Sequence, residues 1–448
     1  MKLTKHAKIA TFIMATLILS SCKASEPQET TTQTQAKTEQ QANADSKTSN
    51  TSKNSTESEP TEIEWYAWLD EESNFTKLTQ AYTELNPNVT FKLNFTPNND
   101  YEQKLVTAFS GGAIIDGFAI QSATSFAVYQ TKGQLHELDS FITEKKADLS
   151  GYEATVESIK MDGGIYALPY RTSAWVIYYN KDIFDAANEP YPDGDWTWEE
   201  YAEVAARLTS GSGVDKVYGN LNFAPTSMWW RIPANSKRSN SPLEPEMLDD
   251  WMQAAEFWLN LSQEGYQPPY ADRAGEAGGD YIGAFLQNKY GMLVSGDWAI
   301  EMLNTKAAEG EVINYDIAPL PHWEGFPAET TGAAALLMVA DKARNPEAVF
   351  DFIYWASSVE GSKILIDNDY FPAWQSDENI TAFTEGKEIP EHIAYIVNQT
   401  INSQVPTDAR YNTAVNIVKE EIELYLLEQQ DLEAAKANII QRMEDEVQ

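Results

Sequence analysis

Apolar and polar side chains repeat with the periods of strands and helices from residue 61 onward. Ile63 to Trp68 is rich in β-formers, and residues 89–95 alternate between apolar and polar side chains, which is the period of a strand. Between these runs, apolar side chains recur at helical spacing, at Phe75, Leu78, Ala81, Tyr82 and Leu85. A strand, a helix and a second strand joined by short loops predict parallel strands linked by a right-handed crossover.

The same alternation continues along the chain, with a helix near 101–109, a strand near 114–120 and a helix that ends at Gly133. A later helix carries one apolar face made of Met247, Leu248, Trp251, Ala255, Trp258 and Leu259. We therefore expect Trp251 and Trp258 in the core, with Gly265 as the helix stop. The tail from Ala414 to Met443 predicts one long amphipathic helix. The fold class is α/β.

The first 60 residues are different in character. Lys2, Lys5 and Lys8 precede an apolar run from Ile9 to Leu19, which is too short to cross a bilayer as a helix and is typical of an export signal. Residues 23–60 contain no Val, Ile, Leu, Met, Phe, Trp or Tyr. Such a segment cannot bury enough surface to fold, so we expect a disordered tether with a reach of about 35 Å.

Cys22 is the only cysteine in the 448 residues. It follows Leu19-Ser20-Ser21, and the four residues together resemble a bacterial lipobox, whose cysteine carries a lipid after cleavage. We therefore expect a signal peptide at residues 1–21, lipidation of Cys22 and a tether over 22–60, with the protein anchored on the extracytoplasmic side of the cell membrane. The alternative is an ordinary secretory signal with an incidental cysteine.

The charge balance narrows the range of partners. With 68 acidic residues against 32 Lys and Arg, the formal net charge is −36. This charge argues against nucleic acid and anionic lipid as partners, and it suits neutral or cationic ligands.

No catalytic or metal-binding motif stands out in the sequence. None of the four histidines shows a metal spacing, so we expect neither a cofactor nor a metal site. Asp193, Asp195 and Glu200 lie close together as in a calcium loop, but the glycine and the full set of alternating donors are missing. A capping box from Thr197 to Glu200 is the simpler interpretation, and a structural calcium stays open.

Aromatic and polar residues follow one predicted strand after another. In open α/β sheets, ligands bind at the carboxyl ends of strands, and aromatic rings with short polar side chains suit the faces and hydroxyls of sugars. The candidates at these strand ends are Trp68, Asp70, Glu71, Gln121, Tyr170, Arg171, Asp297 and Trp298.

Three stretches resemble the family 1 extracellular solute-binding proteins, the sugar-binding components of ABC importers. They are "GGIYALPYRTSAWVIYYNKDIFDAANEPYPDGDWTWEE", "FLQNKYGMLVSGDWAI" and the region around "NYDIAPLPHWEG". The resemblance implies a two-lobed, type II periplasmic-binding-protein-like fold, with hinge strands between the lobes and a ligand cleft. It places lobe 1 at 61–171 with 317–372, and lobe 2 at 172–316 with 373–448.

Carried over by position, the resemblance adds Trp229, Trp230 and Trp374 to the ligand-binding candidates. Asp116 stays open, because family members commonly have Pro-Asp before this strand and this chain reads Ile115-Asp116-Gly117. In a strand, a shift of one residue turns the side chain to the other face.

These observations together predict a monomeric binding lipoprotein rather than an enzyme. It would capture a carbohydrate, in our interpretation an oligosaccharide, by closure of its lobes and deliver it to an ABC permease. A cell-surface glycoside hydrolase is the enzymatic alternative, because it would also combine aromatic rings with a pair of carboxylates. A binding protein for a non-carbohydrate solute is the other alternative, and an adhesive surface protein would not need aromatic residues at successive strand ends.

Overall fold

A computed structural model describes residues 60–447, except 122, 222–227, 240, 275–279, 387–388, 403–407 and 409. The predicted signal peptide, Cys22 and the tether lie outside the described residues. In the described part of the chain, no helix combines the length and the apolar character that crossing a membrane requires.

The first sheet has five strands in the order β2-β1-β3-β10-β4. Their bounds are β1 (Thr61–Trp68), β2 (Val89–Thr96), β3 (Gly117–Ile120), β4 (Ala167–Thr172) and β10 (Ala334–Val339). β1 runs parallel to β2 and β3, whereas β10 runs antiparallel to both β3 and β4. The carboxyl ends of β1 to β4 therefore share one edge of the sheet, and the predicted parallel crossover from β1 to β2 is confirmed.

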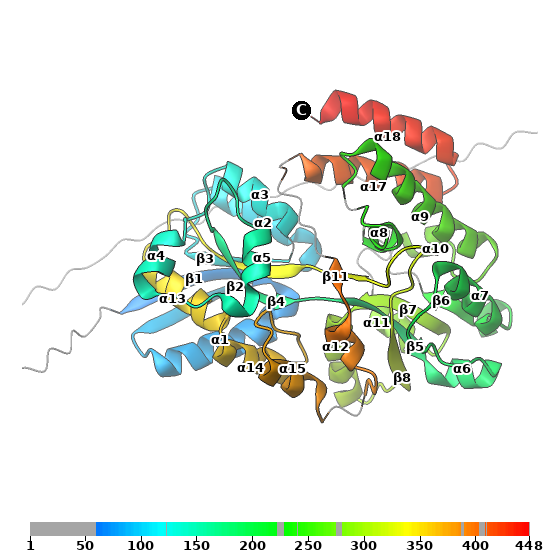
Figure 1. Ribbon diagram of the computed structural model, residues 1–448, viewed down its shortest axis with the longest axis horizontal. Coiled ribbons are helices and arrows are strands. Elements are labelled where there is room, and N and C mark those ends of the chain that lie inside the picture. Colours follow the sequence, from blue (N-terminus) through cyan, green and yellow to red (C-terminus); the bar gives the residue numbers. More distant parts are fainter. Residues whose placement is uncertain are drawn as a thin grey trace, which may run out of the picture. The chain divides into compact units, whose positions relative to one another are not determined.

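Helices cover this sheet (Figure 1), and their apolar faces join its core. They are α1 (Glu72–Leu85), α2 (Asn98–Ser110), α3 (Ala123–Thr131), α4 (Asp139–Lys145), α5 (Glu153–Ser158), α13 (Pro346–Ala356) and α14 (Val359–Asp367), with short 3-10 turns η1 (Leu69–Glu71) and η2 (Ser150–Tyr152). On α1, Phe75, Leu78 and Tyr82 are buried as predicted, whereas Leu85 is exposed because the helix ends there.

The second sheet has four strands in the order β6-β7-β5-β8. They are β5 (Trp175–Asn180), β6 (Tyr218–Leu221), β7 (Tyr290–Gly296) and β8 (Tyr315–Pro319). Every residue of β5 is buried, and alternate side chains enter the separate apolar clusters on its two faces. β7 and β8 run antiparallel to β5, and β6 runs parallel to β7, so β6, β7 and β8 end at the edge where β5 begins.

The helices whose apolar side chains join the two clusters beside this sheet come from several parts of the chain. They are α6 (Lys181–Ala187), α7 (Trp198–Leu208), α8 (Met228–Asn235), α9 (Pro245–Gln263), α10 (Tyr270–Ala274), α11 (Tyr281–Phe285), α12 (Trp298–Ala308), α15 (Asp377–Thr384), α16 (Ala394–Asn398), α17 (Tyr411–Leu426) and α18 (Leu432–Glu446), with the 3-10 turn η3 (Gly213–Asp215) after α7. Trp251 and Trp258 lie in the core, as predicted. The capping box of Thr197 and Glu200 at the start of α7 is also confirmed.

The single helix predicted over residues 414–443 is wrong. The chain forms α17 and α18, which pack against each other (Figure 1). Glu428 takes a left-handed φ of 56°, and the Asp431 carboxylate accepts a hydrogen bond from the Ala434 N–H and caps the new helix. Glu421 of α17 then accepts a 3.1 Å hydrogen bond from Arg442 of α18, which ties the two helices together.

The chain passes between the two sheets more than once, so each lobe of this two-lobed fold is built from separate segments. β4 leads into β5 through Ser173 and Ala174, and β10 returns to the first sheet from β8. The predicted boundary at residue 317 falls inside β8, since Ile317 to Pro319 still pair with β5. Between the sheets, β9 (Thr330–Thr331) pairs with β11 (Ile401–Asn402).

Candidate functional site

Most of the predicted ligand-binding residues follow strands that end next to the β4–β5 connection. Trp68, Gln121 and Arg171 belong to the carboxyl ends of strands in the first sheet, and Asp297 follows β7 in the second. Asp297 is joined directly to the connection: its N–H donates to the Ala174 carbonyl at 3.0 Å, and its Oδ1 accepts from the Ala174 N–H at 3.1 Å. The topology therefore brings the two groups of strand ends to the same connection.

Glu71 and Arg171, which we predicted to bind ligand hydroxyls, bind each other. The Arg171 Nε lies 2.9 Å and its Nη2 2.7 Å from Glu71 Oε1, and Asn74 donates to Oε2 at 2.8 Å. Glu71 is fully buried and Arg171 nearly so. In this conformation, their charges are used to hold the turn after β1 against the end of β4.

Trp68 and Tyr170 are also buried. Trp68 is 2% exposed, with its ring centroid 6.1 Å from that of Tyr101 and 5.8 Å from the Arg171 guanidinium. Tyr170 packs against Phe75 at 5.5 Å. Neither ring presents an open face in this conformation, so a sugar would stack on them only after a rearrangement.

The exposed polar groups at this edge are Asp70 and Gln121, and both contact Asn98. The Asn98 amide donates to the Asp70 carboxylate, and Gln121 Nε2 donates to Asn98 Oδ1 at 2.7 Å. Sequence reasoning missed Asn98, although it opens the helix after β2 and so also follows a strand end. The three side chains form a solvent-facing row of donors and acceptors.

Trp298 is the predicted aromatic residue that remains partly exposed while contacting both lobes. It packs against the core of the first sheet and against the large cluster of the second. Its ring meets Trp175 edge-on at 5.0 Å, and its Nε1 donates to the Tyr281 hydroxyl at 2.9 Å. These contacts fix the ring orientation, which is what a stacking surface for a ligand requires.

Asp297 is fully buried, and burial raises the pKa of its carboxyl group to about 6, although the positive charge of Arg171 lowers it. Oδ2 of this carboxylate has no hydrogen-bond partner among the described residues. Burial also raises the pKa of Glu301; a hydrogen bond from Thr305 opposes this shift, and the smaller effects of the Asp369 and Asp70 charges add to it. The edge therefore carries several carboxylates, and its arginine is already paired.

The other predicted residues fall into two groups. Trp374 is partly exposed and packs edge-on against Tyr152 at 5.4 Å, directly over Gly151, where an added Cβ would lie 2.3 Å from the indole. This contact attaches it to the first lobe, whereas we had expected residues from 373 onward in the second. Trp229 and Trp230 lie in α8, and their side chains are outside what the structure describes.

Asp116 serves the fold at the other edge of the first sheet. It precedes β3, and its carboxylate accepts 2.8 Å hydrogen bonds from the N–H groups of Glu64 and Arg344. Burial alone would raise its pKa, but the Arg344 guanidinium and these N–H groups hold the pKa below its ordinary value. A contact of Asp116 with a ligand at the carboxyl edge is therefore not expected.

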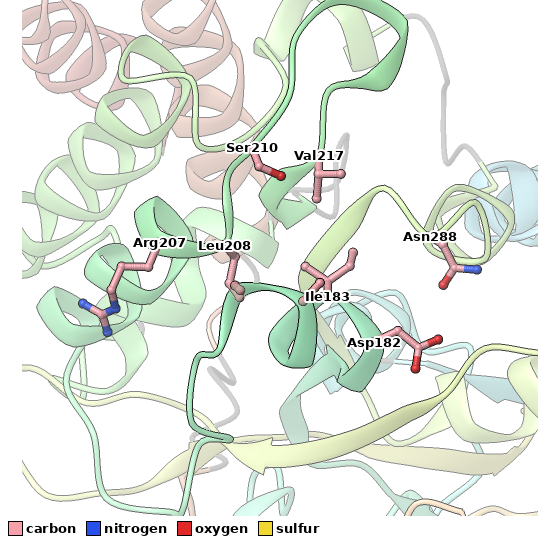
Figure 2. A pocket seen from close by; sticks show the side chains of 9 residues that line it. Asp182, Ile183, Arg207, Leu208, Ser210, Val217 and Asn288 are labelled. Carbon is pink, nitrogen blue, oxygen red and sulfur yellow. The ribbon is translucent and has the colours of Figure 1, made fainter.

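A cavity of about 460 Å³ lies between α6 and α7 (Figure 2). Ile183, Leu208 and Val217 supply apolar walls, and the Arg207 guanidinium forms two 2.8 Å hydrogen bonds with Glu189. The cavity adjoins the end of β5 remote from Trp298, and it contains none of the predicted ligand-binding residues. It is therefore separate from the candidate site.

Comparisons with known proteins agree with this fold. Residues 66–363 match the model of the bacterial extracellular solute-binding protein family. The sn-glycerol-3-phosphate-binding periplasmic protein of Rhizobium meliloti is 25% identical over 413 residues, which span 85% of this chain and 93% of that protein. The mannitol-binding protein of Pseudomonas aeruginosa is 24% identical over 317 residues, which span 65% of this chain and 68% of that protein.

Solved structures show the same fold. A sugar transporter protein of Rhizobium etli in an open conformation superposes with a TM-score of 0.71 at 24% identity, covering 86% of this chain and 99% of that one. An ABC substrate-binding protein of Listeria monocytogenes, solved with cycloalternan, gives a TM-score of 0.72 at 23% identity and the same coverage. The chain belongs to the bacterial extracellular solute-binding protein family.

Proposed function

We propose that this protein is the solute-binding subunit of an ABC importer and that its solute is a carbohydrate, specifically an oligosaccharide. The observation that carries the proposal is the combination at the β4–β5 connection of the partly exposed Trp298 ring with the polar row of Asp70, Asn98 and Gln121. A ring can stack on the C–H face of a sugar, while short amides and carboxylates pair with its hydroxyls.

The charge at this edge favours a neutral solute over a phosphate ester. Relatives of this chain are named for sn-glycerol-3-phosphate and for mannitol, and a structural neighbour was solved with cycloalternan. An anionic phosphate needs free cationic or N–H donors. Arg171 is already paired with Glu71, and the surrounding Asp70, Glu301 and Asp369 are acidic.

The proposed mechanism is closure of the lobes about the β4–β5 connection. A ligand that touches both lobes stabilises the closed state over the open one by its extra contacts there. Asp297 and Trp298 are suited to couple these events, because one is bonded to Ala174 in the connection and the other faces both cores. The closed, loaded form would then be delivered to the permease.

The remaining parts of the proposal concern location and partners. The lipobox resemblance supports a lipid anchor at Cys22 on the extracytoplasmic side of the cell membrane, with the body acting as a monomer. Family members and structural neighbours are binding proteins, which supports a receptor rather than a hydrolase. The acidic surface supports neither nucleic acid nor anionic lipid as a partner.

A thermal-shift screen tests the proposal. The purified chain is melted with a panel of oligosaccharides of different linkage, mannitol and sn-glycerol-3-phosphate, and each mixture is then analysed by chromatography. We expect a large rise in melting temperature for one oligosaccharide, recovered intact. Recovery of cleaved products would identify a glycoside hydrolase instead. A rise only with sn-glycerol-3-phosphate, or with no sugar at all, would mean a non-carbohydrate solute.

A further inference from the structure

Asp316, Glu391 and His392 bring three ligand atoms within 4.8 Å of one another. His392 Nδ1 lies 2.7 Å from Asp316 Oδ2, and the backbone N–H of His392 donates to Oδ1 at 3.0 Å. In the second sheet, Asp316 of β8 lies opposite Tyr179 of β5, near the end of β5 that is remote from the β4–β5 connection. The cluster is therefore separate from the candidate sugar site, and its chemistry does not depend on the proposed function.

The Asp316 carboxylate has no permanent positive charge beside it. Its side chain is 1% exposed, and among the described residues its ion-pair partner is His392, which is charged only when protonated. Lys181 reaches the exposed Glu391 at 3.7 Å instead. A buried carboxylate in such surroundings gains strongly from a bound cation.

The donor set has the chemistry of a zinc site. One imidazole nitrogen and two carboxylate oxygens are common Zn²⁺ ligands, with metal–ligand distances of about 2.0–2.2 Å. Tetrahedral ligands at that radius are about 3.3–3.6 Å apart, a value between the 2.7 Å and 4.8 Å found here, so small side-chain movements would suffice.

Charge and access also fit a divalent ion. Two carboxylates and a neutral imidazole balance one dication. Glu391 and His392 are 69% and 48% exposed, which leaves an entry path and room for a water in the fourth position. The His392 ring stacks on Tyr395 at 5.6 Å, which limits its rotation. Coordination through Nδ1 requires the neutral imidazole to carry its proton on Nε2.

We propose that Asp316, Glu391 and His392 bind a divalent transition-metal ion of the Zn²⁺ type, which fastens the segment before α16 to β8. Asp316 supplies the buried charge, and the two exposed side chains close over the ion from the solvent side. The site joins residues that are 75 positions apart in the sequence, so bound metal raises the stability of the second lobe.

Calorimetric titration with ZnCl₂ tests the site on the full 448-residue chain, untagged and first stripped with EDTA. We expect one saturable site, and a rise in melting temperature when it fills. His392→Ala and Glu391→Gln should each lower the Zn²⁺ affinity by about 100-fold or more. Both side chains are exposed, so these variants should fold normally.

His322 provides the matched control. Its Nε2 lies 2.9 Å from Oδ1 of the exposed Asp195, a histidine–carboxylate pair for which the described residues contain no third ligand. His322→Ala should leave both the Zn²⁺ affinity and the metal-dependent rise in melting temperature unchanged. Absence of saturable Zn²⁺ binding by the unmodified chain would overturn the proposal, as would unchanged affinity in either His392→Ala or Glu391→Gln.

Discussion

The guanidinium of Arg171 lies 2.7 Å from the buried carboxylate of Glu71. The pair joins the end of β4 to the turn after β1, two positions that are 100 residues apart in the sequence. Asn74 completes the coordination of the carboxylate, and the faces of Trp68 and Tyr370 cover the guanidinium. The carboxyl edge of the first sheet is thus fixed by an ion pair that is shielded from water.

Arg171→Ala should destabilise the protein by about 3–5 kcal/mol, because it leaves the Glu71 carboxylate buried without a counter-charge. Denaturant unfolding followed by tryptophan fluorescence measures this loss. Arg207→Ala is the matched control, since Arg207 also forms a two-bonded pair, with Glu189, but is 49% exposed. Arg207→Ala should lower the free energy of unfolding by about 1 kcal/mol or less. Equal losses in the two variants would show that burial adds nothing to the Arg171 pair.

Trp298→Ala should lower the affinity for the best oligosaccharide of the screen by about tenfold or more, since a stacking contact contributes about 1–3 kcal/mol. Trp298→Phe keeps an aromatic ring, although a smaller one that lacks the N–H bonded to Tyr281, so it should retain more of the affinity than the alanine variant. Calorimetry gives the affinities, and circular dichroism checks the fold. Unchanged affinity in the alanine variant would remove Trp298 from the site.

Asp297 should make the stability depend on pH between about 4 and 6. Its folded-state pKa is about 6, above the ordinary value of 3.8, so the folded protein holds this proton where the unfolded chain has lost it. Holding this proton stabilises the folded state at low pH, and this stabilisation is lost as pH rises through 6. The free energy of unfolding of Asp297→Asn, relative to that of the unmodified protein, should therefore rise by about 2 kcal/mol when the pH is raised from 4.5 to 7.

Unfolding curves at these two pH values provide the measurement. The asparagine can keep the bond from the Ala174 N–H, since its Oδ1 replaces that of Asp297. Asp408→Asn serves as the contrast, because the Arg410 guanidinium beside Asp408 holds the pKa of that carboxyl below its ordinary value. Its effect should be small and of opposite sign. A pH-independent difference between Asp297→Asn and the unmodified protein would mean that Asp297 does not titrate in this range.

Cys22→Ser should prevent lipidation, because the hydroxyl does not replace the thiol that would carry the lipid. In a bacterium that processes lipoproteins, fractionation and mass spectrometry should find the variant released or retained as the full precursor. Ser25→Ala, three residues further on, should still be lipidated and remain with the membrane. Normal membrane retention of Cys22→Ser would contradict the anchor.

The sequence predicted the α/β class, the parallel arrangement of the first two strands and the core tryptophans, because each depends on local periodicity. It could not show which of the tryptophans at strand ends are buried and which stay partly exposed. Trp68 and Trp298 both follow the apolar pattern of a strand, yet Tyr101 and Arg171 cover Trp68 while Trp298 keeps a partly exposed ring. Residues distant in sequence determine whether such a ring is buried, so the local sequence pattern does not predict it.

The ion pair of Glu71 with Arg171 and the division between α17 and α18 were not predicted, because the apolar pattern does not show them. Glu71 and Arg171 were each expected to contact ligand, because nothing local shows that they neutralise each other. The division between α17 and α18 depends on a left-handed Glu428 and on the Asp431 cap, within an amphipathic pattern that runs on with little change. The expectation of no metal site rested on sequence spacing and stays an expectation; two residues of the proposed site, Asp316 and His392, meet only in the folded chain.

The position of β10 between β3 and β4 sets an order of events during synthesis and export. Both neighbours of β10 are made before residues 175–319, and β10 follows them. Until β10 emerges, the facing edges of β3 and β4 lack their partner, and the first sheet cannot be completed. The first sheet therefore gains its full set of five strands only after residue 339 has been made, when most of the chain is already complete.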